Sequence, residues 1–112
     1  MVRNVIRRVF LIKRVSMSKC VYLMKSDKYY KIGVSQNPER RAKDLNNRPY
    51  KTILIVKTKP FNDSTAFSIE KELHSYLKGY RVGGEWFNLP IQLVCDVANI
   101  LLSNDTRIIY GG

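Results

Sequence analysis

The chain has 112 residues, 45% of them hydrophobic, and its 20 Lys and Arg against 9 Asp and Glu give a formal net charge of +11. This length suits one domain with a modest core. The excess of positive charge favours polyanionic partners: DNA, RNA or an acidic membrane face. No apolar stretch approaches the roughly 18–20 residues that cross a bilayer, so we expect no membrane span.

The two cysteines, Cys20 and Cys95, are far apart and form no C-x-x-C motif. Together with the single histidine they fall short of the roughly four ligands that a structural zinc site needs. We therefore expect both to act as small hydrophobes in a reducing, intracellular (cytoplasmic) compartment.

Residues 1–16 carry five positive charges and no acidic residue. They can be interpreted as a basic arm along a phosphate backbone, as a targeting peptide, or as an extension upstream of a start at Met17, which we favour. The sequence thus divides into an arm or extension at 1–17, a domain at 18–103 and a tail at 104–112.

The first half of the domain predicts a hairpin, a short helix and a strand. Two β-rich runs, Cys20–Lys25 and Tyr29–Val34, form the hairpin. Asn37 is a good N-cap and a proline follows it, so we expect a helix over Pro38–Leu45. The unbroken apolar centre of Thr52–Thr58 predicts a middle strand that is buried on both faces.

The second half predicts two longer helices. Asp63 or Ser64 caps a helix over Thr65–Leu77, and the core stripe of that helix comprises Ala66, Ile69, Leu73, Tyr76 and Leu77. We expect Trp86–Phe87 to close the core, and Ile91–Leu102 to form the last helix. The order of elements predicts an α+β fold, a small three-stranded antiparallel sheet flanked by helices.

Candidate chemistry begins in the hairpin. A two-residue turn at Ser26 and Asp27 places Tyr22 directly opposite Lys31, where partner Cβ atoms lie about 4.5–5.5 Å apart. A nearby ammonium group favours the phenolate form, so Tyr22 is a candidate general base or proton relay. The ordinary alternative is a strand aromatic beside a solvated lysine.

The two helices add a guanidinium, a carboxylate and an imidazole. Arg41 flanks the buried stripe of the first helix and can reach a phosphate, whereas Arg40 should face solvent. On the second helix Glu70 and His74, four residues apart, share one flank, and Glu72 lies on the other. Glu70 is a candidate Mg²⁺ ligand; the alternative is an ordinary helical side-chain pair.

Five motifs follow one another at compatible spacing: Val21-Tyr22, Tyr30-Lys31-Ile32-Gly33, Asn37-Pro38-Glu39-Arg40-Arg41, Glu70 to His74, and Gly84-Glu85-Trp86-Phe87. In this order they resemble the GIY-YIG nuclease superfamily, in particular its branch of small phage- and virus-type domains. The resemblance covers about residues 19–100.

The resemblance implies a domain that hydrolyses phosphodiester bonds in DNA with one divalent metal ion, Mg²⁺ or Mn²⁺, and that acts in the host cytoplasm if a phage or virus encodes it. By position, Tyr22 and Lys31 take the places of the two motif tyrosines, and Arg41 that of the helix arginine. Glu70 matches the metal-binding glutamate, and His74 belongs to the branch pattern. These residues are the implied catalytic and metal-binding set.

The chain also departs from the family pattern. Cys20 replaces the first motif glycine, and Leu45 stands where many members carry a histidine. Asn88 is a weak match to the terminal asparagine, and the role of Glu85 is ambiguous. A nucleic-acid-binding module of the same fold without catalysis is therefore the main alternative, and a peripheral membrane protein, resting on residues 1–16, is a third.

Overall fold

The structure is a computed structural model that describes residues 17–46 and 49–103. Residues 1–16 of the predicted arm and the whole predicted tail, 104–112, lie outside the described residues. In chain order the elements are β1 (Cys20–Ser26), β2 (Tyr29–Ser35), α2 (Pro38–Asp44), β3 (Thr52–Lys57), α3 (Asp63–Tyr76), the 3₁₀ helix η1 (Lys78–Tyr80), β4 (Arg81–Gly83), β5 (Trp86–Phe87) and α4 (Ile91–Ser103). The predicted α+β class is confirmed.

Within the described residues the sheet has five strands, all paired antiparallel, in the order β3-β1-β2-β5-β4. The predicted three strands are present, and β4 and β5 extend the sheet beyond β2. The sequence prediction missed them because they are only three and two residues long. A tight turn joins them, in which Gly84 has a φ of 54° that favours glycine.

The prediction that Thr52–Thr58 is a middle strand was wrong. Among the described strands β3 lies at the edge of the sheet and β1 pairs on both sides. Ile53 and Ile55 are 60% and 42% exposed, whereas Cys20–Met24 is buried throughout. An apolar run indicates a tendency to form a strand. Whether that strand lies in the middle or at the edge of the sheet depends on the strands that pair with it, which the run does not encode.

The register of the hairpin also differs from the prediction. The turn is formed by Asp27 and Lys28, one residue later than expected, and Asp27 has a φ of 55°. Aspartate tolerates this region better than most residues, which suits the first position of a two-residue hairpin turn. Tyr22 therefore lies opposite Gly33, and Lys31 lies opposite Met24. Because the change moves partners by two residues, Tyr22 and Lys31 remain on the same face of the sheet.

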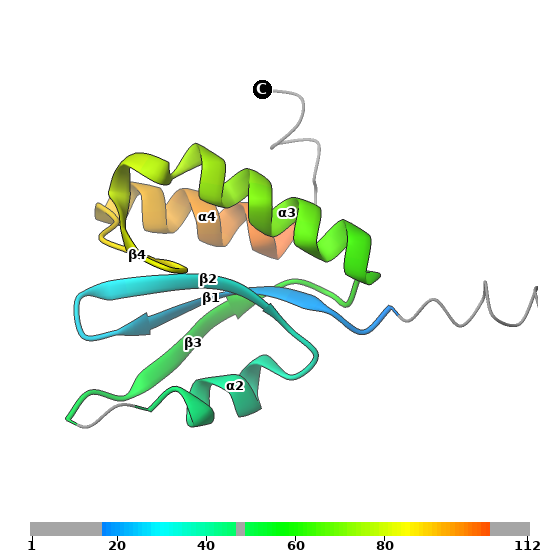
Figure 1. Cartoon of the computed structure of the whole chain (residues 1–112), viewed down its shortest axis with the longest axis horizontal. Helices are drawn as coiled ribbons and strands as arrows, with labels where there is room; N and C mark the ends of the chain where they lie inside the picture. The colour runs from blue at the N-terminus through cyan, green and yellow to red at the C-terminus, as the bar shows by residue number, and fades with distance from the viewer. Residues whose placement is uncertain (1–16, 47–48, 104–112) are drawn as a thin grey trace, which may run out of the picture.

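Helices cover both faces of the sheet, with α3 and α4 on one and α2 on the other (Figure 1). The larger cluster joins Val21, Leu23 and Ile32 to the buried stripes of α3 and α4. The smaller cluster joins Tyr22 and Met24 to Ala42 of α2. Successive residues of β1 thus face opposite clusters, which fixes the strand on both sides.

The helix starts follow the expected capping chemistry with one correction. Asn37 accepts a hydrogen bond from the backbone N–H of Arg40 at 3.0 Å, so the predicted N-cap of α2 is confirmed. On α3 the cap is Asn62, which accepts from the N–H of Thr65 at 2.8 Å, and the prediction of Asp63 or Ser64 was wrong. Both caps are asparagines directly outside the first turn.

The predicted positions of two aromatic side chains, Tyr76 and Trp86, were wrong. Tyr76 is 66% exposed and does not belong to the α3 core stripe, whose other four predicted members are buried. Phe87 is fully buried in the core, but Trp86 is only half-buried and pairs with Lys31 across the sheet. Adjacent strand residues point to opposite faces, so the two aromatics could not both close the same core.

Candidate active site

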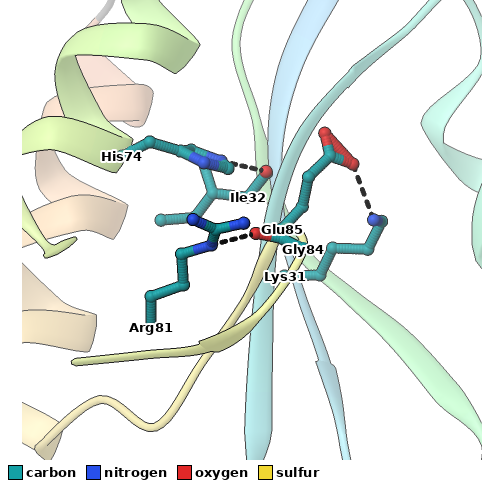
Figure 2. Close-up of polar contacts among 6 residues, drawn as sticks. All are labelled: Lys31, Ile32, His74, Arg81, Gly84 and Glu85. Carbon is teal, nitrogen blue, oxygen red and sulfur yellow. Dashed lines mark hydrogen bonds and ion pairs between the residues drawn. The ribbon is translucent and has the colours of Figure 1, made fainter.

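The candidate site is built around the backbone of Ile32, on the side of β2 that faces away from β1. The carbonyl oxygen of Ile32 accepts a hydrogen bond from Nε2 of His74 at 2.8 Å, and its N–H donates to the carbonyl of Glu85 at 3.2 Å. Figure 2 shows His74 reaching this strand from α3 and Glu85 lying beside Lys31. A helix and the β4–β5 turn thus meet at one point of β2.

Tyr22 is 1% exposed and its ring lies against the backbone of Gly33. A Cβ atom at position 33 would lie 2.7 Å from Cζ of Tyr22 and closer still to its hydroxyl oxygen. Real Cβ atoms do not approach that closely. The glycine of the Tyr-Lys-Ile-Gly run is therefore required by the close approach of the phenol, not by a positive φ.

Arg41 and Arg40 behave as the helical-face argument predicts. The Arg41 guanidinium acts on the Tyr22 phenol both as a hydrogen-bond donor and as a charge. Arg40 points away, pairs with Asp44 at 3.4 Å and has a side chain that is 75% exposed. Because α2 packs on the face that holds Tyr22, its inner flank delivers one arginine to the phenol.

Lys31 is 5% exposed and makes an ion pair with Glu85, in which Nζ and Oε1 are 2.7 Å apart. The same ammonium lies 5.5 Å from the ring centroid of Trp86, within cation–π range. The predicted direct pairing of Lys31 with Tyr22 is therefore replaced by a pairing with Glu85. The buried ammonium is neutralised by a carboxylate from 54 residues further along the chain.

Glu70, His74 and Glu85 bring their donor atoms together, each within 4.8 Å of the others. Glu70 and His74 come from successive turns of α3, as their spacing predicts. Glu85 comes from the β4–β5 turn, which Arg81 holds by donating from Nε to the Gly84 carbonyl at 2.7 Å (Figure 2). Two carboxylates and an imidazole at this separation can surround a divalent cation.

The electrostatics of Tyr22 contradict the expectation of a stabilised phenolate. Burial raises the pKa of Tyr22 to about 12, and the negative charges of Glu85 and Glu70 add to the effect. Arg41 opposes these causes without overcoming them. The expectation failed because it placed a free ammonium beside the phenol, whereas Lys31 is already neutralised by Glu85.

The pKa of Glu70 is raised as well, to about 7. Burial is the largest cause, followed by the charge of Glu85 and a hydrogen bond with its carboxyl group, while Lys31 acts in the opposite direction. Two carboxyls in contact resist ionising together. The charge of Lys31 therefore only partly offsets burial and the repulsion between the Glu70 and Glu85 carboxyls.

The site includes one residue, Glu85, whose role the sequence left open, and the weak candidate Asn88 stays a prediction. Glu85 was ambiguous because a glutamate before two aromatics has no spacing relation to a distant helix. Its position after two glycines was the available signal, since a tight turn can aim the next side chain. Asn88 is exposed, and its described contact is a backbone N–H that donates to the Tyr80 carbonyl at 2.8 Å.

A family model described as the T5orf172 domain matches residues 19–102, more than half of the chain. Domains of this family are nuclease-like, which defines the class of the protein. The chain belongs to the T5orf172 domain family. No curated protein and no solved structure matches it.

A nuclease-like domain binds nucleic acid, in agreement with the charge of +11. In the parts of the chain that the structure describes, no helix has the length and apolar character to traverse a bilayer.

Proposed function

We propose that this protein is a metal-dependent endonuclease that hydrolyses phosphodiester bonds in DNA, in the manner of the GIY-YIG nucleases. One observation carries the proposal: the Tyr22 phenol lies close enough to the guanidinium of Arg41 and to the carboxylates of Glu70 and Glu85 for all three to shift its pKa. Phosphodiester hydrolysis requires a proton acceptor and groups that stabilise the charge developing on the phosphate. A phenol, a guanidinium and carboxylates close to one strand can supply these functions.

The residues around Glu70 fit a divalent cation, Mg²⁺ or Mn²⁺. The Glu70 carboxyl is half-buried, and its burial together with the charge of the neighbouring Glu85 carboxyl raises its pKa to about 7. A cation beside this pair would relieve their repulsion. Such an ion, when bound, supplies charge stabilisation to a phosphoryl oxygen and lowers the pKa of bound water.

Tyr22 is the proposed proton acceptor. Once Glu70 and Glu85 are neutralised, burial is the remaining cause that raises the pKa of Tyr22, and Arg41 opposes it. The phenolate form of Tyr22, which the Arg41 charge favours, then accepts the proton of the attacking water and becomes the neutral phenol. Its ring cannot turn toward β2, because the Gly33 backbone lies against it.

Arg41 is the proposed donor to the scissile phosphate. Arg41 is exposed, and its guanidinium donates a hydrogen bond to the Tyr22 phenol. A guanidinium presents two parallel N–H groups to phosphate oxygens, which stabilises the charge that develops on them. Lys31 contributes less directly than the sequence suggests, since its ion pair with Glu85 fixes that carboxylate beside Glu70.

The test is cleavage of supercoiled plasmid by the purified full chain with Mg²⁺ or Mn²⁺, beside EDTA and the variant Glu70→Ala. We expect nicking that requires metal and is lost in the variant. Glu72→Ala is the matched control, because Glu72 is exposed on the same helix and lies outside the donor cluster. Nicking that survives Glu70→Ala would contradict the role of Glu70.

The alternative is a nucleic-acid-binding module without catalysis. The raised pKa of Tyr22, to about 12, is the observation that favours it, because such a phenol is protonated at neutral pH. Retarded but intact plasmid in every lane, with affinity that falls with salt and survives EDTA, would support this function and reject the endonuclease.

A further inference from the structure

We infer that His74 and Glu85 join Glu70 in a single cation site, and that this site selects a transition-metal ion of the Mn²⁺ class over Mg²⁺ and Ca²⁺. The inference deepens the proposed function and rests on it for the purpose of the metal. It assigns His74 a different role from the catalytic one that the sequence implies, and it assigns Glu85 a role of its own.

The orientation of His74 leaves one ring nitrogen available as a ligand. Nε2 lies 2.8 Å from the carbonyl oxygen of Ile32, and since a carbonyl only accepts, Nε2 must carry the proton. Nδ1 of the neutral ring then carries a lone pair. The edge-to-face contact with Phe87, with centroids 4.9 Å apart at 90°, holds the ring plane. Metal-binding histidines commonly donate their second nitrogen to a backbone carbonyl in this way.

The backbone around Glu85 is held in place by a glycine turn and two hydrogen bonds. Gly84 has a φ of 54°, its carbonyl is held by Arg81 at 2.7 Å, and the Glu85 carbonyl accepts from the N–H of Ile32 at 3.2 Å. The carboxylate is then directed by Lys31, 2.7 Å from Oε1. Because the Glu85 carboxylate is already held in place, it loses little conformational entropy when it binds a cation.

The three donors also discriminate between cations. Mg²⁺ prefers oxygen ligands and gives up its water reluctantly, and Ca²⁺ takes oxygen ligands in larger numbers. An imidazole suits transition metals, and two carboxylates are compatible with Mn²⁺. Because Ile32 and Phe87 fix the His74 ring, the nitrogen ligand is built into the site.

The experiment is calorimetric titration of the full chain with MnCl₂ and with MgCl₂, without nucleic acid. We expect one Mn²⁺ site with an affinity at least about tenfold above that for Mg²⁺. Glu85→Gln should weaken Mn²⁺ binding about tenfold or more, the scale of changes around a metal site. His74→Gln should reduce the Mn²⁺ preference over Mg²⁺, and Glu72→Gln, on the exposed flank of α3, should change neither.

A second measurement uses the unmodified protein, so its result does not depend on whether a variant folds. His74 is the single histidine of the chain, so its imidazole gives one set of NMR signals. Substoichiometric Mn²⁺ should broaden these signals selectively. Sharp imidazole signals in the presence of bound Mn²⁺, or unchanged affinity in a folded Glu85→Gln variant, would overturn the inference. Cleavage without these effects would leave the proposed function standing. Mn²⁺ binding without cleavage would support the inference and reject the endonuclease.

Discussion

The phenol of Tyr22 lies against the backbone of Gly33, its direct partner across the β1–β2 hairpin. This pairing determines where the hydroxyl group points, because no side chain at position 33 could share the space. It also explains a motif in which a glycine stands in the middle of a strand. Glycine weakens a strand interior, and here its lack of a side chain is used for a close approach.

Gly33→Ala should therefore displace Tyr22. The new methyl group would overlap the ring, so we expect a loss of about 1–3 kcal/mol in the free energy of unfolding, typical of overpacking, together with loss of cleavage. Gly79→Ala is the matched control, because a Cβ there meets nothing within 4 Å. Chemical denaturation of both variants measures the difference. Equal stability of the two would show that Tyr22 can move aside at no cost.

Arg41→Ala and Arg40→Ala form a second matched pair on α2. Both side chains are exposed, so neither substitution should change the thermal midpoint by much. We expect Arg41→Ala to reduce the cleavage rate by about 10²–10³, the scale for removing one donor to a transition state. Arg40→Ala should cleave like the wild type. The measurement is the single-turnover rate of plasmid cleavage for both variants. If both variants lose the same fraction of this rate, the two arginines contribute only general affinity for DNA.

The raised pKa of Glu70 predicts how stability changes with pH in the presence of EDTA. Its pKa rises from an ordinary 4.5 to about 7 on folding, so between these values the folded protein holds a proton that the unfolded chain releases. The free energy of unfolding should thus fall as pH rises through this window. Glu70→Gln should reduce that slope. Urea denaturation of both proteins at a series of pH values measures this slope. If the slope is the same in the variant, another titrating group causes the pH dependence of stability.

The tautomer of His74 is a further prediction. Since Nε2 is hydrogen bonded to the Ile32 carbonyl, long-range ¹H–¹⁵N NMR of the neutral ring should show a protonated Nε2 and an unprotonated Nδ1. The opposite tautomer would contradict the hydrogen bond and remove the lone pair that the cation site needs.

Several features of the fold were predictable because they depend on neighbours in the sequence. Asn37 and the following proline start α2, and helical spacing places Glu70 and His74 on one flank. Tyr22 and Lys31 share a face even though the predicted register was wrong, since a shift of two residues preserves the alternation of a strand. The error in the predicted register changed the cross-strand partner of each residue but not the face of the sheet on which the residue lies.

The features that failed depend on contacts between distant residues. The edge position of β3 and the exposure of Tyr76 follow from which strands and helices pack together. No local pattern in the sequence encodes those partners.

The sequence by itself determined the α+β class, the start of α2 and the candidate groups Tyr22, Arg41, Glu70 and His74 as members of particular faces. Only the tertiary structure decided that Glu85 meets Lys31, which is 54 residues away, and lies against Glu70. That meeting removes the free ammonium from Tyr22, and the charge of Glu85 adds to burial, the larger cause, in raising the pKa values of both Tyr22 and Glu70. The physical reason is that charge interactions and burial act through space over a few ångströms, whereas sequence patterns report only which face a residue occupies.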